Sequence, residues 1–140
     1  MTKSVGFALI TAVLWGFTSV LAKIGLKGNL NPLAATVVRS LGIAVCMSTT
    51  LVVAGKGQSL IQADPKSILC IAAVGLIAGG LAQWTYYVAL KNGEASQIVP
   101  VAATYPLVAL VFSLIFLGES LSLSKGIGTV LIVIGIISIQ

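Results

Sequence analysis

Five apolar segments of about twenty residues each constrain this chain more than any other feature. They are Ser4–Ile24, Pro32–Val53, Ile68–Leu90, Ala95–Leu117 and Leu121–Ile139. A transmembrane α-helix needs about 20 consecutive, mostly apolar residues to cross the hydrocarbon core of a bilayer. The sequence therefore predicts an all-α membrane protein. We expect a bundle of five transmembrane helices that forms one domain over residues 1–140, with almost no soluble part.

The balance of hydrophobic and charged residues supports a chain that lies in lipid. Hydrophobic residues make up 58% of the sequence and charged residues only 8%. A soluble domain carries about a quarter charged residues and has to cover its exterior with polar groups. A β-barrel would need alternating polar and apolar residues, whereas runs such as Leu107–Phe112 are continuous. A helical membrane bundle is the architecture that remains.

The polar connections between the apolar segments are short. They are residues 27–32, 55–66, 91–94 and 118–120. Short loops require that neighbouring helices run antiparallel, and only residues 58–66 leave room for a small amphipathic turn. The first segment is longer than the core of a signal peptide, which has roughly 7–15 residues, so it is interpreted as a retained spanning helix.

The charged residues exclude several classes of function. Eight Lys and Arg against three Asp and Glu give a net charge of +5, but the basic residues are scattered singly near the ends of apolar runs. Interfacial anchoring explains that pattern, and Lys23 is expected to snorkel to the headgroups. No basic patch with interleaved aromatic residues is present, so nucleic-acid binding is not expected.

Catalysis and metal binding are also disfavoured. The chain has no histidine, and its three carboxylates, Asp64, Glu94 and Glu119, lie in the predicted loops. A Ser–His or paired-aspartate mechanism and an ordinary zinc site therefore lack their residues. Cys46 and Cys70 lie inside apolar runs and are interpreted as small buried hydrophobic residues. We expect no enzyme, metal or cofactor; the predicted partners are the lipid bilayer and a small-molecule substrate.

Polar side chains inside predicted spans point to a substrate pathway, because such groups are costly in lipid and usually face a bundle interior or a cavity. The candidate substrate-binding residues are Trp15, Arg39, Gln83, Tyr87 and Tyr105. Trp15 is mid-helix, where the interfacial aromatic belt does not explain it, whereas the belt fits Tyr87 as well as a lining role does. Arg39 lies about 10 Å into its helix, so snorkelling and a cavity-facing position both remain open.

Small residues and prolines predict where helices pack and bend. Gly75 and Gly79 form a GxxxG pair whose spacing of four continues to Gln83 and Tyr87 on one face. Gly128 and Gly135 are seven residues apart and share a face of the last segment. We expect these glycines to serve helix packing.

Two prolines, Pro100 and Pro106, lie inside the fourth segment. Each removes a backbone donor, so a hinge or kink is predicted there. Transporters often build substrate sites from interrupted helices. A kink that only improves packing is the alternative.

An ordered set of short motifs resembles a known family. In chain order the motifs are Leu14–Phe17, Val38–Arg39, Tyr86–Lys91, Pro106, Leu117–Glu119, Gly128 and Gly135. Their order and spacing resemble one repeat of the EamA family of the drug/metabolite transporter superfamily, over nearly the whole chain.

The resemblance implies a carrier for small metabolites that works by alternating access. Most members of that family have two repeats of opposite orientation, whereas this chain has one. We therefore expect a multi-pass secondary transporter of the plasma (inner) membrane, with export favoured, that acts as a dimer of half-size repeats. The alternative is a non-transporting membrane subunit or a half-transporter partner of a paralogous protein or membrane enzyme.

The charges within the spans favour certain substrates. The related small multidrug resistance proteins bind cationic drugs and protons through a glutamate in their first helix, and this chain has no acidic residue there. No carboxylate lies in any predicted span, whereas Arg39 does. Because a desolvated cation would lack a counter-charge, neutral, zwitterionic or anionic substrates are expected.

The distribution of basic residues bears on assembly. One side of the predicted bundle has Lys3, Lys56, Lys66 and Lys125, and the other has Lys23, Lys27 and Lys91, with Arg39 nearest that side. Orientation in the membrane follows this bias, which here is weak enough to allow insertion both ways. Because transport pathways commonly form between inverted repeats, we expect an antiparallel homodimer or a paralogous partner.

Overall fold

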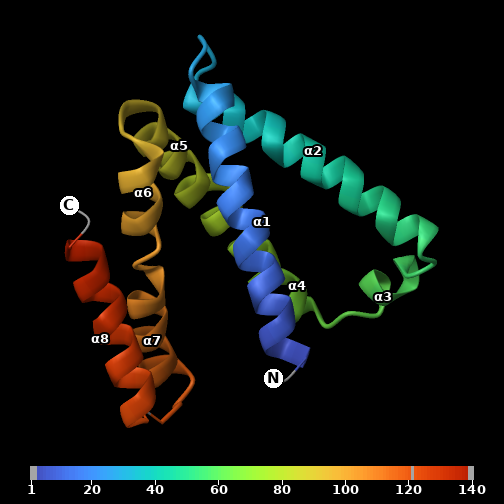
Figure 1. Ribbon diagram of the computed structural model, residues 1–140. Coiled ribbons are helices and arrows are strands. Elements are labelled where there is room, and N and C mark those ends of the chain that lie inside the picture. Colours follow the sequence, from blue (N-terminus) through green and yellow to red (C-terminus); the bar gives the residue numbers. More distant parts are fainter. Residues whose placement is uncertain (1–2, 121, 139–140) are drawn as a thin grey trace. The chain divides into compact units, whose positions relative to one another are not determined.

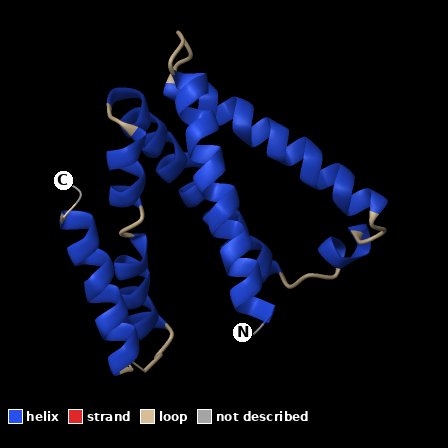
Figure 2. Cartoon of the chain, in the orientation of Figure 1, coloured by secondary structure: helices blue, strands red, loops and turns tan. Residues whose placement is uncertain are grey.

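The computed structural model describes residues 3–120 and 122–138, and all of the regular secondary structure in these residues is helical (Figures 1 and 2). The helices are α1 (Lys3–Leu26), α2 (Pro32–Val53), α3 (Gly57–Ile61), α4 (Pro65–Val74), the π-helix η1 (Gly75–Leu81), α5 (Ala82–Asn92), α6 (Ala95–Ala102), α7 (Tyr105–Phe116) and α8 (Leu123–Ile137). The predicted all-α class is confirmed for the described part of the chain.

Four helical stretches among the described residues are long and apolar enough to cross a membrane. They are Lys3–Leu26, Pro32–Val53, Pro65–Asn92 and Ala95–Phe116. The predicted fifth helix was expected to begin at Leu121 and end at Ile139, and both residues lie outside the described part. Between them α8 has 15 residues, fewer than a span usually needs. The structure thus supports a multi-pass helical membrane protein, while the count of five spans stays a prediction.

Helix starts follow from local sequence. The Asn31 side chain accepts a hydrogen bond from the Leu33 amide at 2.8 Å, and Pro32 is the first residue of α2. At α4 the Asp64 carboxylate accepts from the Ser67 amide at 3.0 Å, again with a proline first. Both are N-caps in which a side-chain oxygen pairs with a free amide of the first turn.

The connection between α2 and α4 contains the short helix α3, where the sequence left room for a small turn. Gly55 follows α2 with a φ of 66°, a left-handed conformation that glycine adopts without steric cost. Leu60 and Ile61 of α3 are exposed among the described residues.

The chain divides into two compact units, which are described separately. The first extends to Asn92 and contains α1–α5, and the second begins at Gly93 and contains α6–α8. In the first unit α5 packs against both α1 and α2, and α2 also contacts η1. Its buried side chains gather where the end of α1, the start of α2 and the second half of α5 meet. They are Leu26, Ala35, Thr36, Tyr87 and Leu90.

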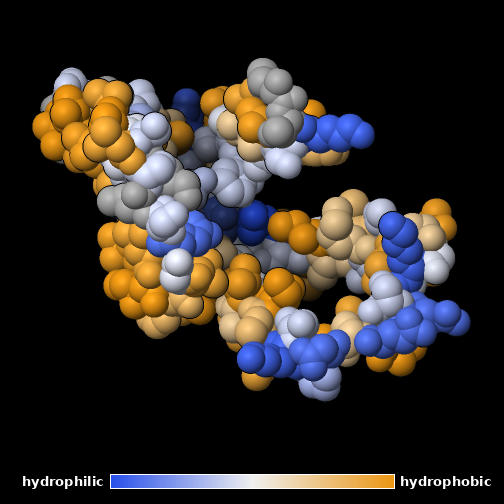
Figure 3. All heavy atoms as spheres, turned by 90° about the horizontal axis from the view of Figure 1, so that it is seen from below, coloured by the Kyte–Doolittle hydropathy of each residue, from blue (hydrophilic) through white to orange (hydrophobic). Residues whose placement is uncertain are grey.

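Most other apolar side chains are exposed within the described chain. Hydrophobic residues cover broad areas of the molecular surface, and hydrophilic residues form separate patches (Figure 3). Cys46 and Cys70 are both exposed, so the prediction that they are buried within this chain is wrong. The physical reason is that apolar positions of a membrane helix face lipid or another chain as readily as a protein core.

The third spanning stretch, predicted as 68–90, extends over Pro65–Asn92 and is not a uniform α-helix. Its centre, Gly75–Leu81, is a π-helix with α4 before it and α5 after it. Hydrogen bonds in a π-helix connect residues five apart, so each turn contains more residues than an α-turn. The wider turns break the single α-helical face predicted from Gly75 through Gln83 to Tyr87.

The fourth stretch is interrupted at Ala103 and Thr104, between α6 and α7. Pro106 has no backbone N–H, so the carbonyl of Ala102 cannot receive its usual helical hydrogen bond. The Thr104 amide and hydroxyl both bond to the Val101 carbonyl, at 3.1 and 2.8 Å. These tighter bonds end α6, and α7 begins at the next residue.

Candidate functional site

The first unit contains a line of polar contacts between α1 and α5. The Tyr86 hydroxyl donates to the Ser19 hydroxyl at 3.0 Å, and the Ser19 hydroxyl donates to the Trp15 carbonyl at 2.9 Å. The Ser19 hydroxyl is thereby a donor to its own helix and an acceptor from the neighbouring one. In lipid such interhelical bonds average about 0.6 kcal/mol.

One turn further along both helices, the Lys23 ammonium donates to the Leu90 carbonyl at 2.6 Å. Leu90 is fully buried and lies in the last turn of α5, where carbonyls lack intrahelical donors and the helix dipole is negative. Lys23 is half-buried, so its ammonium bonds within the bundle rather than snorkelling as predicted.

Both contacts join residues that are 67 positions apart in sequence. A constant offset over one helical turn means that α1 and α5 run parallel in this region. This direction is what antiparallel connections on either side of α2 require. A third contact joins the Lys91 ammonium of α5 to the Leu30 carbonyl in the α1–α2 connection, at 2.8 Å. Together these bonds fix α5 against α1 and against the turn that leads into α2.

The candidate residues of the first unit occupy different environments. Trp15 is exposed on α1, one turn before Ser19, and Arg39 is exposed on α2 without a hydrogen bond to a described residue. Gln83 is half-buried in the first turn of α5. Tyr87 is buried, and its ring centroid lies 6.2 Å from that of Tyr86. Trp15 and Gln83 thus lie on the two helices that form the α1–α5 contact, whereas Tyr87 belongs to the small core.

In the second unit the candidate residues surround the helix interruption. Tyr105 is the exposed first residue of α7 and Pro106 is the second, while Pro100 lies inside α6. The non-helical pair Ala103–Thr104 lies between the two prolines. The Thr104 hydroxyl bonds to the backbone at this interruption, and Tyr105 is the residue that follows it.

The glycines predicted to pack helices make no close approach inside the chain. A Cβ added at any of them would meet no atom within 4 Å, which holds for Gly75, Gly79, Gly128 and Gly135. These positions are open within each described unit, and a packing role for them stays a prediction.

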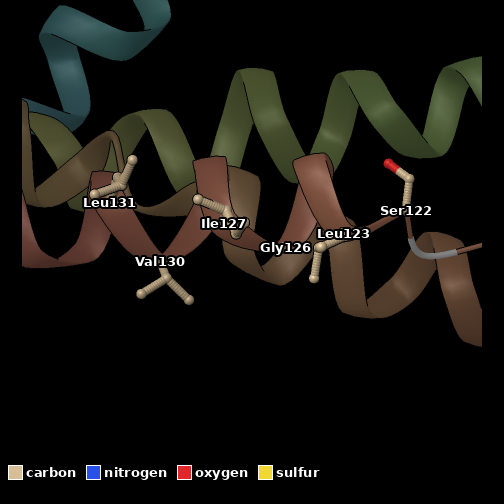
Figure 4. Close-up of a pocket in the computed structure, with 6 residues that line it drawn as sticks. All are labelled: Ser122, Leu123, Gly126, Ile127, Val130 and Leu131. Atoms are coloured by element: carbon tan, nitrogen blue, oxygen red, sulfur yellow. The ribbon is translucent and has the colours of Figure 1, made fainter.

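A shallow hollow of about 550 Å³ lies along α8 (Figure 4). Its lining residues are Ser122, Leu123, Gly126, Ile127, Val130 and Leu131. A ligand site normally combines an enclosed apolar surface with a few convergent polar groups, and one serine does not supply them. None of the candidate substrate residues lines this hollow. Among the described residues no cluster of His, Cys, Asp and Glu has the size needed to hold a metal ion.

The long apolar helices define the class of this molecule as a multi-pass α-helical membrane protein. The profile of the EamA-like transporter family matches residues 2–139. The chain therefore belongs to the EamA-like transporter family, within the drug/metabolite transporter superfamily, and the resemblance noted in its motifs is confirmed. Members of this family are membrane transporters and generally not enzymes.

Two relatives match over most of their own length. An uncharacterized protein of Methanocaldococcus jannaschii is 35% identical over 138 residues, which cover 98% of this chain and 96% of that protein. An uncharacterized transporter in the cobO 3′ region of a Sinorhizobium species is 30% identical over 130 residues, covering 92% of this chain and 90% of that protein. No solved structure matches the chain.

Proposed function

We propose that this protein is a secondary transporter that moves a small metabolite across the plasma membrane by alternating access, with export as the favoured direction. The observation that carries the proposal is the family match, which includes nearly every residue of the chain. The relative from Sinorhizobium, itself named a transporter, adds support.

We further propose that the transport pathway forms between two half-size chains. One argument is burial: among the described residues the first unit buries five side chains, and candidate residues such as Trp15 and Arg39 are exposed. The other argument is the length of the two relatives, which consist almost entirely of the region that matches this chain. An antiparallel homodimer would bring two inverted copies together, and a paralogous half would serve the same purpose.

In this proposal the lining residues are Trp15, Arg39, Gln83, Tyr87 and Tyr105. Arg39 is a cation within the second span and makes no hydrogen bond to a described residue, so it is available to an anionic or zwitterionic substrate. The interrupted stretch between Pro100 and Pro106 is the proposed hinge of the fourth span. The open glycines of η1 and α8 are proposed contacts with the second chain.

The experiment is a transport screen with the purified protein in proteoliposomes. The panel contains cationic, neutral, zwitterionic and anionic metabolites, each tested under an imposed pH or Na⁺ gradient and against protein-free liposomes. We expect saturable transport of at least one compound without net positive charge. For such a compound the Arg39→Gln variant should lose transport, while Lys27→Gln, a matched control near a helix end, should retain it. Saturable transport of a quaternary ammonium compound would count against the proposed substrate class. If no compound is transported, the result would count against the proposed function.

The antiparallel arrangement is tested separately with reporter fusions at the C-terminus. A cytoplasm-active and a periplasm-active reporter should both give signal, because the chain would insert in both orientations. Signal from one reporter alone, in cells that lack a paralogous gene, would exclude the antiparallel homodimer. Signal from one reporter in cells that have such a gene would favour the paralogous partner.

A further inference from the structure

The two halves of the third spanning stretch differ in their hydrogen bonds to the rest of the first unit. Its second half, α5, bonds to α1 and to the α1–α2 connection through Tyr86, Leu90 and Lys91. In α4, the first half, the described side-chain hydrogen bonds are those between Ser67 and the N-cap Asp64. No described side chain of α4 hydrogen-bonds to another helix.

Burial follows the same division. Tyr87 and Leu90 of α5 are buried, whereas α4 contains no buried residue and its Leu69 and Ile71 are each 71% exposed. In Figure 1, α1 and α2 meet near α5 and diverge toward the end where α3 connects to α4. At one end of the first unit, α5 is therefore hydrogen-bonded to its neighbours, and we call this the fastened end. At the other end α4 has no such bonds, and we call this the open end.

The π-helix η1 lies between α5, which is at the fastened end, and α4, which is at the open end. π-Helices are rare, mostly one turn long and frequent at functional sites. Because each π-turn contains more residues than an α-turn, η1 can exchange its five-residue hydrogen bonds for four-residue ones, which changes the rotation and angle of α4. A Cβ added to Gly79 or Gly80 within η1 would meet no atom of a neighbouring element within 4 Å, so these two positions leave room for that exchange.

We propose that η1 is a hinge about which α4 moves, and that Lys23 and Lys91 are positioning residues that hold α5 fixed. Each lysine bonds a backbone carbonyl of a neighbouring element, so α5 cannot rotate without breaking both bonds. The hinge then confines movement to the open end of the unit. Its purpose rests on the proposed transport function, but its movement can be measured without any substrate.

The native cysteines provide the measurement. Cys46 on α2 and Cys70 on α4 are both exposed, so each accepts a nitroxide label for dipolar EPR in lipid, with unlabelled chains added to dilute contacts between copies. The reference pair is Leu21→Cys and Val88→Cys on α1 and α5, in a background with both native cysteines replaced by serine. We expect a broad or two-component distance distribution for Cys46–Cys70 and a narrow one for the reference pair. Equal widths would overturn the hinge.

Two sets of variants separate the hinge from the positioning residues. Deletion of Ile77 lets η1 close as an α-helix, so the Cys46–Cys70 distribution should lose its second component. If that deletion does not fold, the Gly79→Ala/Gly80→Ala variant should shift the distribution in the same direction. Unchanged distributions in the folded hinge variants would overturn the proposal.

For the lysines, Lys23→Met/Lys91→Met should broaden the reference distribution. The matched control Lys27→Met/Lys56→Met removes two exposed lysines and should leave it narrow. An unchanged reference pair in the first variant would overturn the positioning role. A protein that moves about η1 but transports nothing would overturn the proposed function alone, and one that transports with a rigid η1 would overturn the hinge alone.

Discussion

Lys23 is a charged side chain that hydrogen-bonds to a backbone carbonyl of a neighbouring helix. Its ammonium lies 2.6 Å from the oxygen of Leu90, at a helix end where the dipole favours a cation. The same pairing provides a donor for a carbonyl on a fully buried residue. The Lys23 side chain, near the end of α1, therefore connects α1 to α5.

We predict that Lys23→Met lowers the free energy of unfolding by about 1–3 kcal/mol, the cost of leaving a buried acceptor without a partner. Tyr86→Phe removes one interhelical hydroxyl bond and should cost about 0.6 kcal/mol. The measurement is unfolding in a defined lipid or detergent mixture. Lys27→Met is the control and should behave like the wild type, whereas equal losses for Lys23→Met and Lys27→Met would contradict the structural role of the Lys23 bond.

At this scale the sequence could predict candidate residues for a pathway, which remain untested, but not which side chains meet. Trp15, Gln83 and Arg39 are candidates because polar groups in spans are costly, and the structure places them on α1, α5 and α2, respectively. The Tyr86–Ser19 and Lys23–Leu90 contacts depend on the register between two helices 67 residues apart. Periodicity within one helix contains no information about that register.

The elements themselves follow closely from hydropathy and caps. Pro32–Val53 has its predicted ends, because Asn31 and Pro32 specify the start of a helix. The π-helix was not predictable, because an extra residue per turn leaves the apolar composition of Gly75–Leu81 unchanged. The interruption between α6 and α7 lies beside Pro106, where the missing amide breaks the hydrogen-bond pattern.

We predict that Pro106→Ala joins α6 and α7 into one continuous helix, because alanine restores an amide donor for the Ala102 carbonyl. Hydrogen–deuterium exchange at residues 103–105 should become slower, and transport should fall if the interruption serves movement. Pro100→Ala is the matched control, since Pro100 lies inside α6 and its replacement leaves the break in place. Fast exchange at 103–105 that persists in Pro106→Ala would contradict this explanation.

At the scale of the whole molecule, the described chain has four stretches that can span a membrane and one shorter apolar helix. An apolar helix can cross a bilayer in either direction, so hydropathy predicts the spans but not their orientation. Hydropathy identifies a membrane protein, and the family match adds that the chain belongs to the EamA-like transporter family. In the proposed dimer the substrate would be recognised by residues of both chains, and no single-chain pattern specifies how they meet.

The small buried core has a thermodynamic consequence. Five side chains are buried among the described residues, all of them in the first unit, so the proposed dimer would add most of the packing between helices. Binding that occurs only in the folded state raises apparent stability by mass action. We predict that the midpoint of thermal unfolding rises with the protein-to-lipid ratio and falls on dilution with lipid. A midpoint of thermal unfolding that stays constant over a hundredfold dilution would contradict this prediction, because the single chain would then be stable without a partner.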